Sequence, residues 1–158
     1  MLHQNRQRIL RICRVHARTP QDQEDLYQEV LCQIWRALPG LREKAHVNTW
    51  LYRVTLNTAI SYVRKSAAER RATETGGDEF KIQAGEWEPA AAPNPRREQL
   101  YEAIARLNEL EKAVVTMFLD DLSYDEIGRV MNIDTSHVGV LLHRAKKKLS
   151  ALMKETLE

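Results

Sequence analysis

Apolar residues recur at helical spacing along most of this 158-residue chain, and no alternating strand pattern interrupts them. Residues 6–17 are predicted to form a first helix. Residues 20–38 are predicted to form a second, with apolar side chains at every fourth position (Leu26, Val30, Ile34 and Leu38). A third helix is expected from 50 to about 71, and it is apolar on more than one side, which indicates a central place in the core. The pattern therefore predicts an all-α protein.

Local signals set several of the expected helix ends. Thr19 and Pro20 fit an N-cap followed by proline at the first helical position. Pro39 and Gly40 should end that helix, and residues 41–48 should form a polar loop. Asn48 or Thr49 is then expected to cap the third helix.

The carboxy-terminal third has the most specific pattern. After helices expected at 97–107 and 109–119, Ser123 and Glu126 form the spacing of a capping box. Residues 132–134 should break that short helix, and Asp134 can cap a longer one with a buried stripe formed by Val138, Leu142, Ala145, Leu149 and Leu152. A capped helix, a turn and a longer basic helix are typical of helix-turn-helix proteins that enter the DNA major groove. The outer face of the second helix supplies the candidate DNA contacts, which are Ser136, His137, Val140, His143, Arg144 and Lys147.

Between these blocks, residues 72–95 are rich in glycine, proline and alanine, which predicts a flexible linker. Five acidic residues there stand against one lysine, a net charge of −4 within a chain of net charge +2. The flanking parts are therefore basic, which favours a nucleic-acid surface at each end. The expected organisation is a helical domain over 1–71, an acidic linker over 72–95 and a helix-turn-helix domain over 96–158.

Composition excludes several other classes. No apolar run approaches the ~20 residues of a membrane span, and the amino terminus has no apolar secretory core, so a cytoplasmic protein without membrane contact is expected. Cys13 and Cys32 are expected to be buried, reduced thiols. A zinc site formed by both cysteines and His16 would lack a fourth ligand, so no metal and no cofactor are predicted. No catalytic motif is present, and the chain is not expected to be an enzyme.

Two blocks of sequence resemble a known family. D-Q-E-D-L-Y-Q-E-V-L-C-Q-I-W-R-A-L at 22–38 and N-T-W-L-Y-R-V-T-L-N-T-A-I-S-Y-V-R-K at 48–65 resemble the promoter-melting domain of bacterial RNA polymerase sigma factors, especially the two-domain extracytoplasmic-function (ECF) group. A-I-A-R-L-N-E-L-E-K from Ala103 and L-S-Y-D-E-I-G at 122–128 resemble that group's second domain. The resemblance implies a DNA-binding transcription initiation factor. Its partners would be promoter DNA and core RNA polymerase, bound at the largest-subunit coiled coil and the flap region.

The resemblance also implies roles for individual residues. In the 22–38 helix, candidate contacts with the polymerase coiled coil are Asp25, Gln28, Glu29 and Arg36. Without the resemblance, these residues of the 22–38 helix could equally form an acidic surface that contacts only solvent. The loop 41–47 and the following helix would capture the unpaired −10 strand, through Trp50, Arg53, Asn57, Tyr62, Arg64 and Lys65. An extruded base needs a stacking surface, edge hydrogen bonds and nearby cations. Trp50 and Tyr52 point about 200° apart on a helix, so they should not share one role, and a structural role for Trp50 stays open.

One stretch departs from the family pattern. Where typical members carry lysine, serine and arginine in the recognition helix, this chain has Gly139, Val140 and Leu141. An apolar side chain can contact a thymine methyl but cannot hold a phosphate. Two hypotheses follow: an ECF factor that reads a −35 element through Ser136, His137 and Arg144, or a factor with weakened −35 readout that a partner protein recruits. A helix-turn-helix regulator that never joins polymerase is a further alternative, and an anti-sigma factor is an additional candidate partner.

Overall fold

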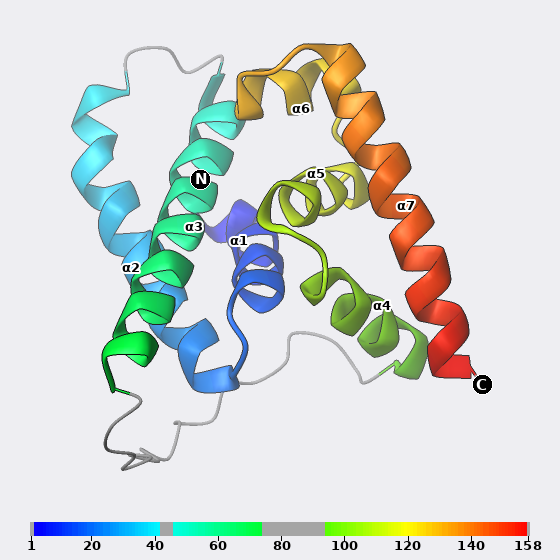
Figure 1. Cartoon of the computed structure of the whole chain (residues 1–158). Coiled ribbons are helices and arrows are strands. Elements are labelled where there is room, and N and C mark those ends of the chain that lie inside the picture. Colours follow the sequence, from blue (N-terminus) through cyan, green and yellow to red (C-terminus); the bar gives the residue numbers. More distant parts are fainter. Residues whose placement is uncertain (1, 42–45, 74–93, 158) are drawn as a thin grey trace.

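The computed structural model describes residues 2–41, 46–73 and 94–157, and it is helical with no strand in those ranges (Figure 1). The prediction of an all-α fold is confirmed. The elements in chain order are α1 (Leu2–His16), α2 (Pro20–Ala37), the 3-10 turn η1 (Leu38–Gly40), α3 (Val47–Thr73), α4 (Pro95–Ala105), α5 (Glu109–Leu119), α6 (Tyr124–Met131) and α7 (Thr135–Leu157). None of these helices is both long and apolar enough to cross a membrane.

Most helix starts follow the expected caps, with one exception. The Thr19 hydroxyl accepts a hydrogen bond from the Asp22 amide at 3.1 Å, as predicted for the start of α2. Helix α3 begins at Val47, so Asn48 lies inside its first turn and the predicted cap at Asn48 or Thr49 is wrong. Helix α4 begins at Pro95, because proline fits the first helical position behind the Asn94 cap. The linker prediction over 72–95 falls largely on residues 74–93, outside the described part of the chain.

The amino-terminal helices α1, α2 and α3 pack together through one apolar face each. Leu26, Val30 and Ile34 of α2 are fully buried, as their i+4 spacing predicts. Cys13 of α1 is buried as well, but Cys32 is exposed, so the expectation of two buried thiols is wrong for Cys32. The reason is geometric, since residue 32 lies on the side of α2 away from the buried positions 26, 30 and 34.

The turn between α6 and α7 has the predicted local chemistry. The Ser123 hydroxyl accepts from the Glu126 amide at 3.1 Å, and the Glu126 carboxylate accepts from the Ser123 amide at 2.9 Å. Asn132 ends α6 in the left-handed region, at φ 56°. Gly128 is required here, because a Cβ at that position would lie 2.7 Å from the Ile133 carbonyl oxygen. These constraints fix the direction of α7.

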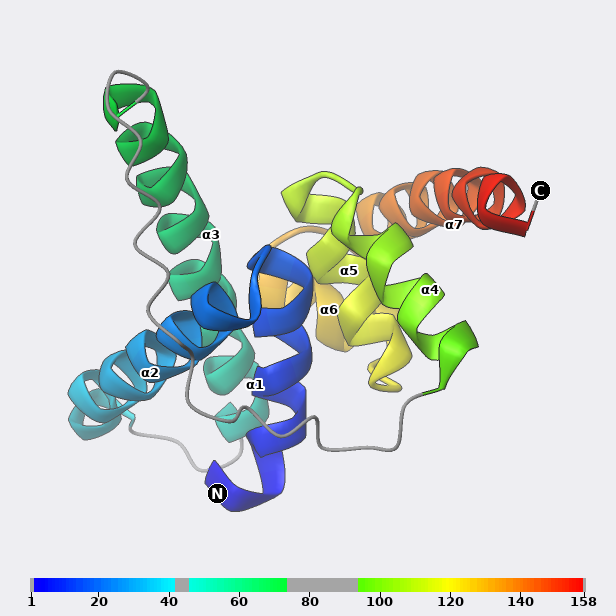
Figure 2. The same cartoon turned by 90° about the horizontal axis from the view of Figure 1, so that it is seen from below.

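Helix α1 lies between the α2–α3 pair and the α4–α7 helices (Figures 1 and 2). It packs against α4 and α5, while α3 packs against α6. As a result, the buried apolar side chains of both halves belong to one continuous core cluster. Helices α2 and α7 lie on opposite sides of the molecule.

Replacing a core leucine of α7 should destabilise the fold strongly. Leu142 is 1% exposed, so Leu142→Ala should lower the free energy of unfolding by about 3 kcal/mol, through lost burial and a residual cavity. The matched control is Leu110→Ala in α5. Leu110 is 49% exposed, so the expected change is within about 0.5 kcal/mol. Urea unfolding followed by circular dichroism measures both, and equal losses would contradict this packing.

Candidate nucleic-acid and polymerase interfaces

A stripe of exposed side chains runs along the outer face of α2. We call Asp25, Gln28, Cys32 and Trp35 the outer α2 stripe; they follow one another at spacings of three, four and three, so they share one side of the helix. Glu29 and Arg36, the other predicted polymerase contacts, are exposed beside this stripe. The four predicted contacts are therefore all accessible on one helix.

Trp35 is the residue that the sequence reasoning missed on this face. Its side chain is 76% exposed, the largest value among the exposed large apolar residues. Large aromatic side chains are enriched at protein interfaces and often dominate their energy. The sequence feature that could have identified Trp35 is its position three residues after Cys32, which places both side chains on the same side of α2. An exposed tryptophan among acidic and amide groups is what a protein-binding surface would present.

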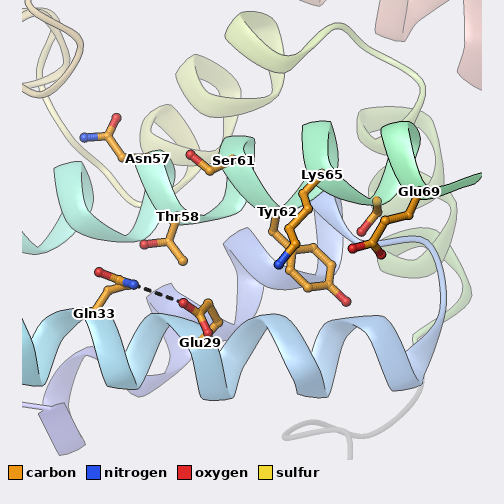
Figure 3. A pocket seen from close by; sticks show the side chains of 9 residues that line it. Glu29, Gln33, Asn57, Thr58, Ser61, Tyr62, Lys65 and Glu69 are labelled. Carbon is orange, nitrogen blue, oxygen red and sulfur yellow. Dashed lines mark hydrogen bonds between the residues drawn. The ribbon is translucent and has the colours of Figure 1, made fainter. Parts of the chain in front are cut away.

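A pocket of about 500 Å³ opens between α2 and α3 (Figure 3). Three of the predicted −10 contacts line it, namely Asn57, Tyr62 and Lys65, and all three come from α3. The remaining lining residues were not predicted as −10 contacts, and they are Glu29, Gln33, Thr58, Ser61, Ser66 and Glu69. Gln33 donates to the Glu29 carboxylate at 3.0 Å, which fixes part of the α2 wall.

The pocket combines the groups that an unstacked base requires. The Tyr62 ring offers a stacking surface, the Asn57 amide can both donate and accept, and Lys65 supplies a cation. Burial and the charges of Asp22 and Asp25 raise the pKa of Tyr62, and its hydroxyl donates to the Asp22 carboxylate at 3.5 Å, so the ring is the part of Tyr62 that remains for a base. Glu29 could accept from an exocyclic amino group.

The other predicted −10 residues lie elsewhere. Trp50 is partly buried and packs against the core, and Arg64 is exposed without lining the pocket. Arg53 donates two hydrogen bonds to the Arg129 carbonyl oxygen of α6, the one from Nε at 3.2 Å. Tyr52 is buried and donates to Asp120, which gives it a structural role. Most of the predicted loop 41–47, residues 42–45, lies outside the described residues.

The outer face of α7 presents all six predicted −35 contacts: Ser136, His137, Val140, His143, Arg144 and Lys147 are exposed. Of the three unusual positions, Leu141 is buried, and a Cβ on Gly139 would lie 3.7 Å from the Tyr124 ring. Val140 is 47% exposed and Tyr124 is 42% exposed. Tyr124 was not predicted as part of this face. Its ring beside the recognition helix adds an aromatic group to a face that otherwise carries Val140 and polar and basic side chains.

The lysines after Arg144 differ in what they contact. Lys148 donates to both oxygens of the buried Glu111 carboxylate, at 2.8 and 3.0 Å. The Lys146 ammonium lies 4.4 Å from the centre of the Phe118 ring. Within the described residues, no ion pair or hydrogen bond engages Lys147. Lys147 is therefore the lysine of this run most available to a phosphate.

No group of three or more histidine, cysteine, aspartate or glutamate side chains that could hold a metal ion occurs in the described ranges.

Comparison with protein families matches both halves of the chain. Residues 1–69 match the family model for Sigma-70 region 2, and residues 97–149 match that for Sigma-70, region 4. The chain is 30% identical over 141 residues to the ECF RNA polymerase sigma-E factor of Escherichia coli (strain K12), covering 81% of this chain and 72% of that protein. It is 25% identical over 138 residues to the RNA polymerase sigma factor YlaC of Bacillus subtilis (strain 168), covering 85% and 79%.

Solved structures show the same fold. The sigma factor RpoE in complex with the anti-sigma factor NepR from Bartonella quintana superposes with a TM-score of 0.74 at 18% identity, covering 96% of this chain and 95% of that one. CnrH in complex with the cytosolic domain of CnrY superposes with a TM-score of 0.66 at 17% identity, covering 98% and 85%. The arrangement of α1–α7 is therefore one that solved structures share, among them that of the sigma factor RpoE.

Substitution of Lys147 should change DNA affinity, whereas substitution of the neighbouring Lys148 should change the stability of the fold. Lys147→Ala should weaken duplex DNA binding. It should also make the decline of log affinity with log salt concentration shallower by about 0.9, which is the value expected for the loss of one phosphate contact. Lys148→Ala, the matched control, should instead lower the free energy of unfolding by about 1.5 kcal/mol, because it leaves the Glu111 carboxylate unpaired. Fluorescence anisotropy at several salt concentrations, together with urea unfolding, measures both. The reverse assignment of effects would refute this reading of α7.

Proposed function

This chain belongs to the ECF group of bacterial RNA polymerase sigma factors, and on that premise we propose which of its surfaces bind polymerase and which bind promoter DNA. As a sigma factor it binds core RNA polymerase, recognises promoter −10 and −35 DNA and starts transcription. Its family consists of transcription initiation factors rather than known enzymes. We take the chain to act without catalysis of its own, in the cytoplasm where core polymerase works.

The outer α2 stripe is the proposed docking surface for core polymerase. It places Asp25 and Gln28 in line with Trp35, and Glu29 and Arg36 stand beside them. An aromatic anchor flanked by polar and charged groups is a common composition for the energetic centre of an interface. We assign this surface to the coiled coil of the polymerase's largest subunit. The flap region is the proposed partner of the α4–α7 half.

The pocket between α2 and α3 is the proposed site for an extruded −10 base. This assignment has the strongest single observation behind it, because a stacking ring and a cation from α3 point toward α2 in a cavity that Asn57 also lines (Figure 3). Trp50, Arg53 and Arg64 are the proposed contacts outside the pocket. The proposed division of the chain remains a −10 and docking part over 1–71, a linker over 72–95 and a −35 part over 96–158.

The outer face of α7 is the proposed −35 reader. Ser136, His137 and Arg144 supply donors and acceptors for base edges, and Val140 can contact a thymine methyl. All six candidate contacts of α7 are exposed, which supports an ordinary −35 reader over the version with weakened readout. An anti-sigma factor is a proposed additional partner. The RpoE structure named above contains the anti-sigma factor NepR, and the CnrH structure contains the cytosolic domain of CnrY.

Replacing two residues of the outer α2 stripe should prevent docking. Gln28→Ala combined with Trp35→Ala should weaken binding to core polymerase by at least about tenfold, the effect of losing an aromatic anchor. The control is Glu102→Ala on α4, an exposed residue far from the stripe in the sequence. Co-elution with core polymerase in size-exclusion chromatography, followed by titration, gives both values. Binding that survives the double substitution would show that the docking surface lies elsewhere.

A promoter test checks the −35 assignment. Transcription by the reconstituted holoenzyme from a promoter with a scrambled −35 element should fall steeply relative to the intact promoter, because each lost base contact costs about 1–3 kcal/mol. Arg144→Ala should reduce transcription from the intact promoter and leave the scrambled one unchanged. Equal rates from the two promoters would favour the factor with weakened −35 readout.

A further inference from the structure

We propose that Tyr124, Gly139 and Val140 form an apolar patch that selects a thymine in the −35 element by contacting its 5-methyl group. The proposal deepens the −35 role assigned above to the outer face of α7, and it rests on that role. It makes these three positions determinants of base choice, at the stretch where the recognition helix departs from the family pattern.

Val140 lies at the centre of the surface that α7 presents outward. A line of four exposed residues runs along this face at spacings of four, three and four: Ser136, Val140, His143 and Lys147. Val140 is the apolar member of this line, and its side chain is 47% exposed. When such a line enters the major groove, its middle positions meet base edges. Val140 is therefore placed to contact a base.

The Tyr124 ring stands beside this line. A Cβ built at Gly139 would lie 3.7 Å from Cε2 of the Tyr124 ring, which is an ordinary contact distance. Because Gly139 has no side chain, nothing from that position covers the ring edge or the neighbouring Val140. Tyr124 is 42% exposed, so its ring is accessible there. An aromatic ring and an aliphatic side chain thus present one apolar patch on both sides of Gly139.

Local structure holds the parts of the patch together. Tyr124 is the first residue of α6, directly after the capping box that starts this helix. A Cβ at Gly128 would lie 2.7 Å from the Ile133 carbonyl oxygen, so α6 and the segment leading into α7 are in close contact. The backbone at Tyr124 therefore has a fixed position relative to Gly139. A contact surface held by two packed helices is more precise than one on a loop.

Thymine is the base that this patch favours. In the major groove, thymine alone presents a methyl group, and the other base edges present hydrogen-bond donors and acceptors. An apolar patch would leave those polar groups without partners, which costs free energy. The thymine methyl instead buries apolar surface against Val140 and the Tyr124 ring. The burial of one methyl group corresponds to about a fourfold gain in affinity.

The surroundings of the patch favour a base over a partner protein. Arg144 and Lys147 are exposed on the same face, and no hydrogen bond or ion pair among the described residues engages either of them. These cations can neutralise DNA phosphates beside the base that the patch contacts. The core of a protein–protein interface is by contrast depleted of charged residues. A small apolar patch among free cations therefore fits the major groove.

Replacing thymine by uracil in the DNA removes the methyl group alone and tests the proposal directly. Reconstituted holoenzyme first selects duplexes from a pool randomised across the −35 element, and the selected duplexes should be enriched in thymine. Each selected thymine is then replaced singly by deoxyuridine. At the position that the patch contacts, uracil should weaken binding about fourfold in a competition assay. A pool without enriched thymine would overturn the proposal, and so would equal binding of all uracil duplexes.

Substitutions in the chain assign the effect to the patch. Val140→Ala and Tyr124→Ala should each lower the preference for thymine over uracil to about twofold or less, and Tyr124→Phe should keep it because the ring remains. Lys147→Ala is the matched control, since a phosphate contact does not distinguish the two duplexes and both should weaken by the same factor. Each preference is a ratio measured on one protein, so partial unfolding does not change it. Full preference in Val140→Ala would overturn the proposal.

Gly139→Lys tests the role of the missing side chain. Lysine has a higher helix propensity than glycine, so this substitution should not weaken α7. Its added charge should tighten binding to both duplexes, whereas its side chain should cover the patch and remove the preference for thymine. Tighter binding with the preference unchanged would refute the role assigned to Gly139.

Failure of methyl recognition can be told apart from failure of the −35 role. Transcription from the intact promoter and from one with a scrambled −35 element measures that role. If scrambling lowers transcription but thymine and uracil duplexes bind equally, the −35 role stands and methyl recognition is refuted. If scrambling has no effect, both are refuted.

Discussion

The buried Asp120 carboxylate is the interaction on which the arrangement of the halves depends. Tyr52 and Arg11 bind it from two helices of the amino-terminal half, and it sits at the end of a helix of the other half. Because an unpaired charge is too costly to bury, this contact specifies how α1, α3 and α5 meet. It also turns residue 52 inward, and residue 53, about 100° further around α3, then reaches α6.

That constraint separates the working surfaces of the sigma factor. Helices α2 and α7 lie on opposite sides of the molecule (Figure 1), and the outer α2 stripe and the outer face of α7 are both exposed. The α2–α3 pocket depends on packing within the amino-terminal half alone. Only Arg53, among the proposed DNA contacts, is engaged by the other half within the described residues.

Local chemistry explains what the sequence could predict. The capping box at Ser123, the break after Met131 and the stripe on α7 are set by residues a few positions apart, so the helix-turn-helix was predicted closely. The same 3.6-residue period placed all six α7 contacts on the exposed face. Asp120 and Tyr52 are 68 positions apart, and no local pattern links them. Likewise, the α2 wall of the pocket, formed by Glu29 and Gln33, appears only when α2 packs on α3. Trp35 was not singled out, because its exposure follows from how α2 packs on α1 and α3.

The most direct test of this account is the distance between the two halves of the chain, measured with spin labels on Ala68→Cys and Ser150→Cys in the otherwise unchanged protein and in Asp120→Ala. The account predicts a short, narrow distribution when Asp120 is present and a longer, broader one in Asp120→Ala, because the substitution removes the buried contact that joins α1, α3 and α5. Identical distributions in the two proteins would contradict it.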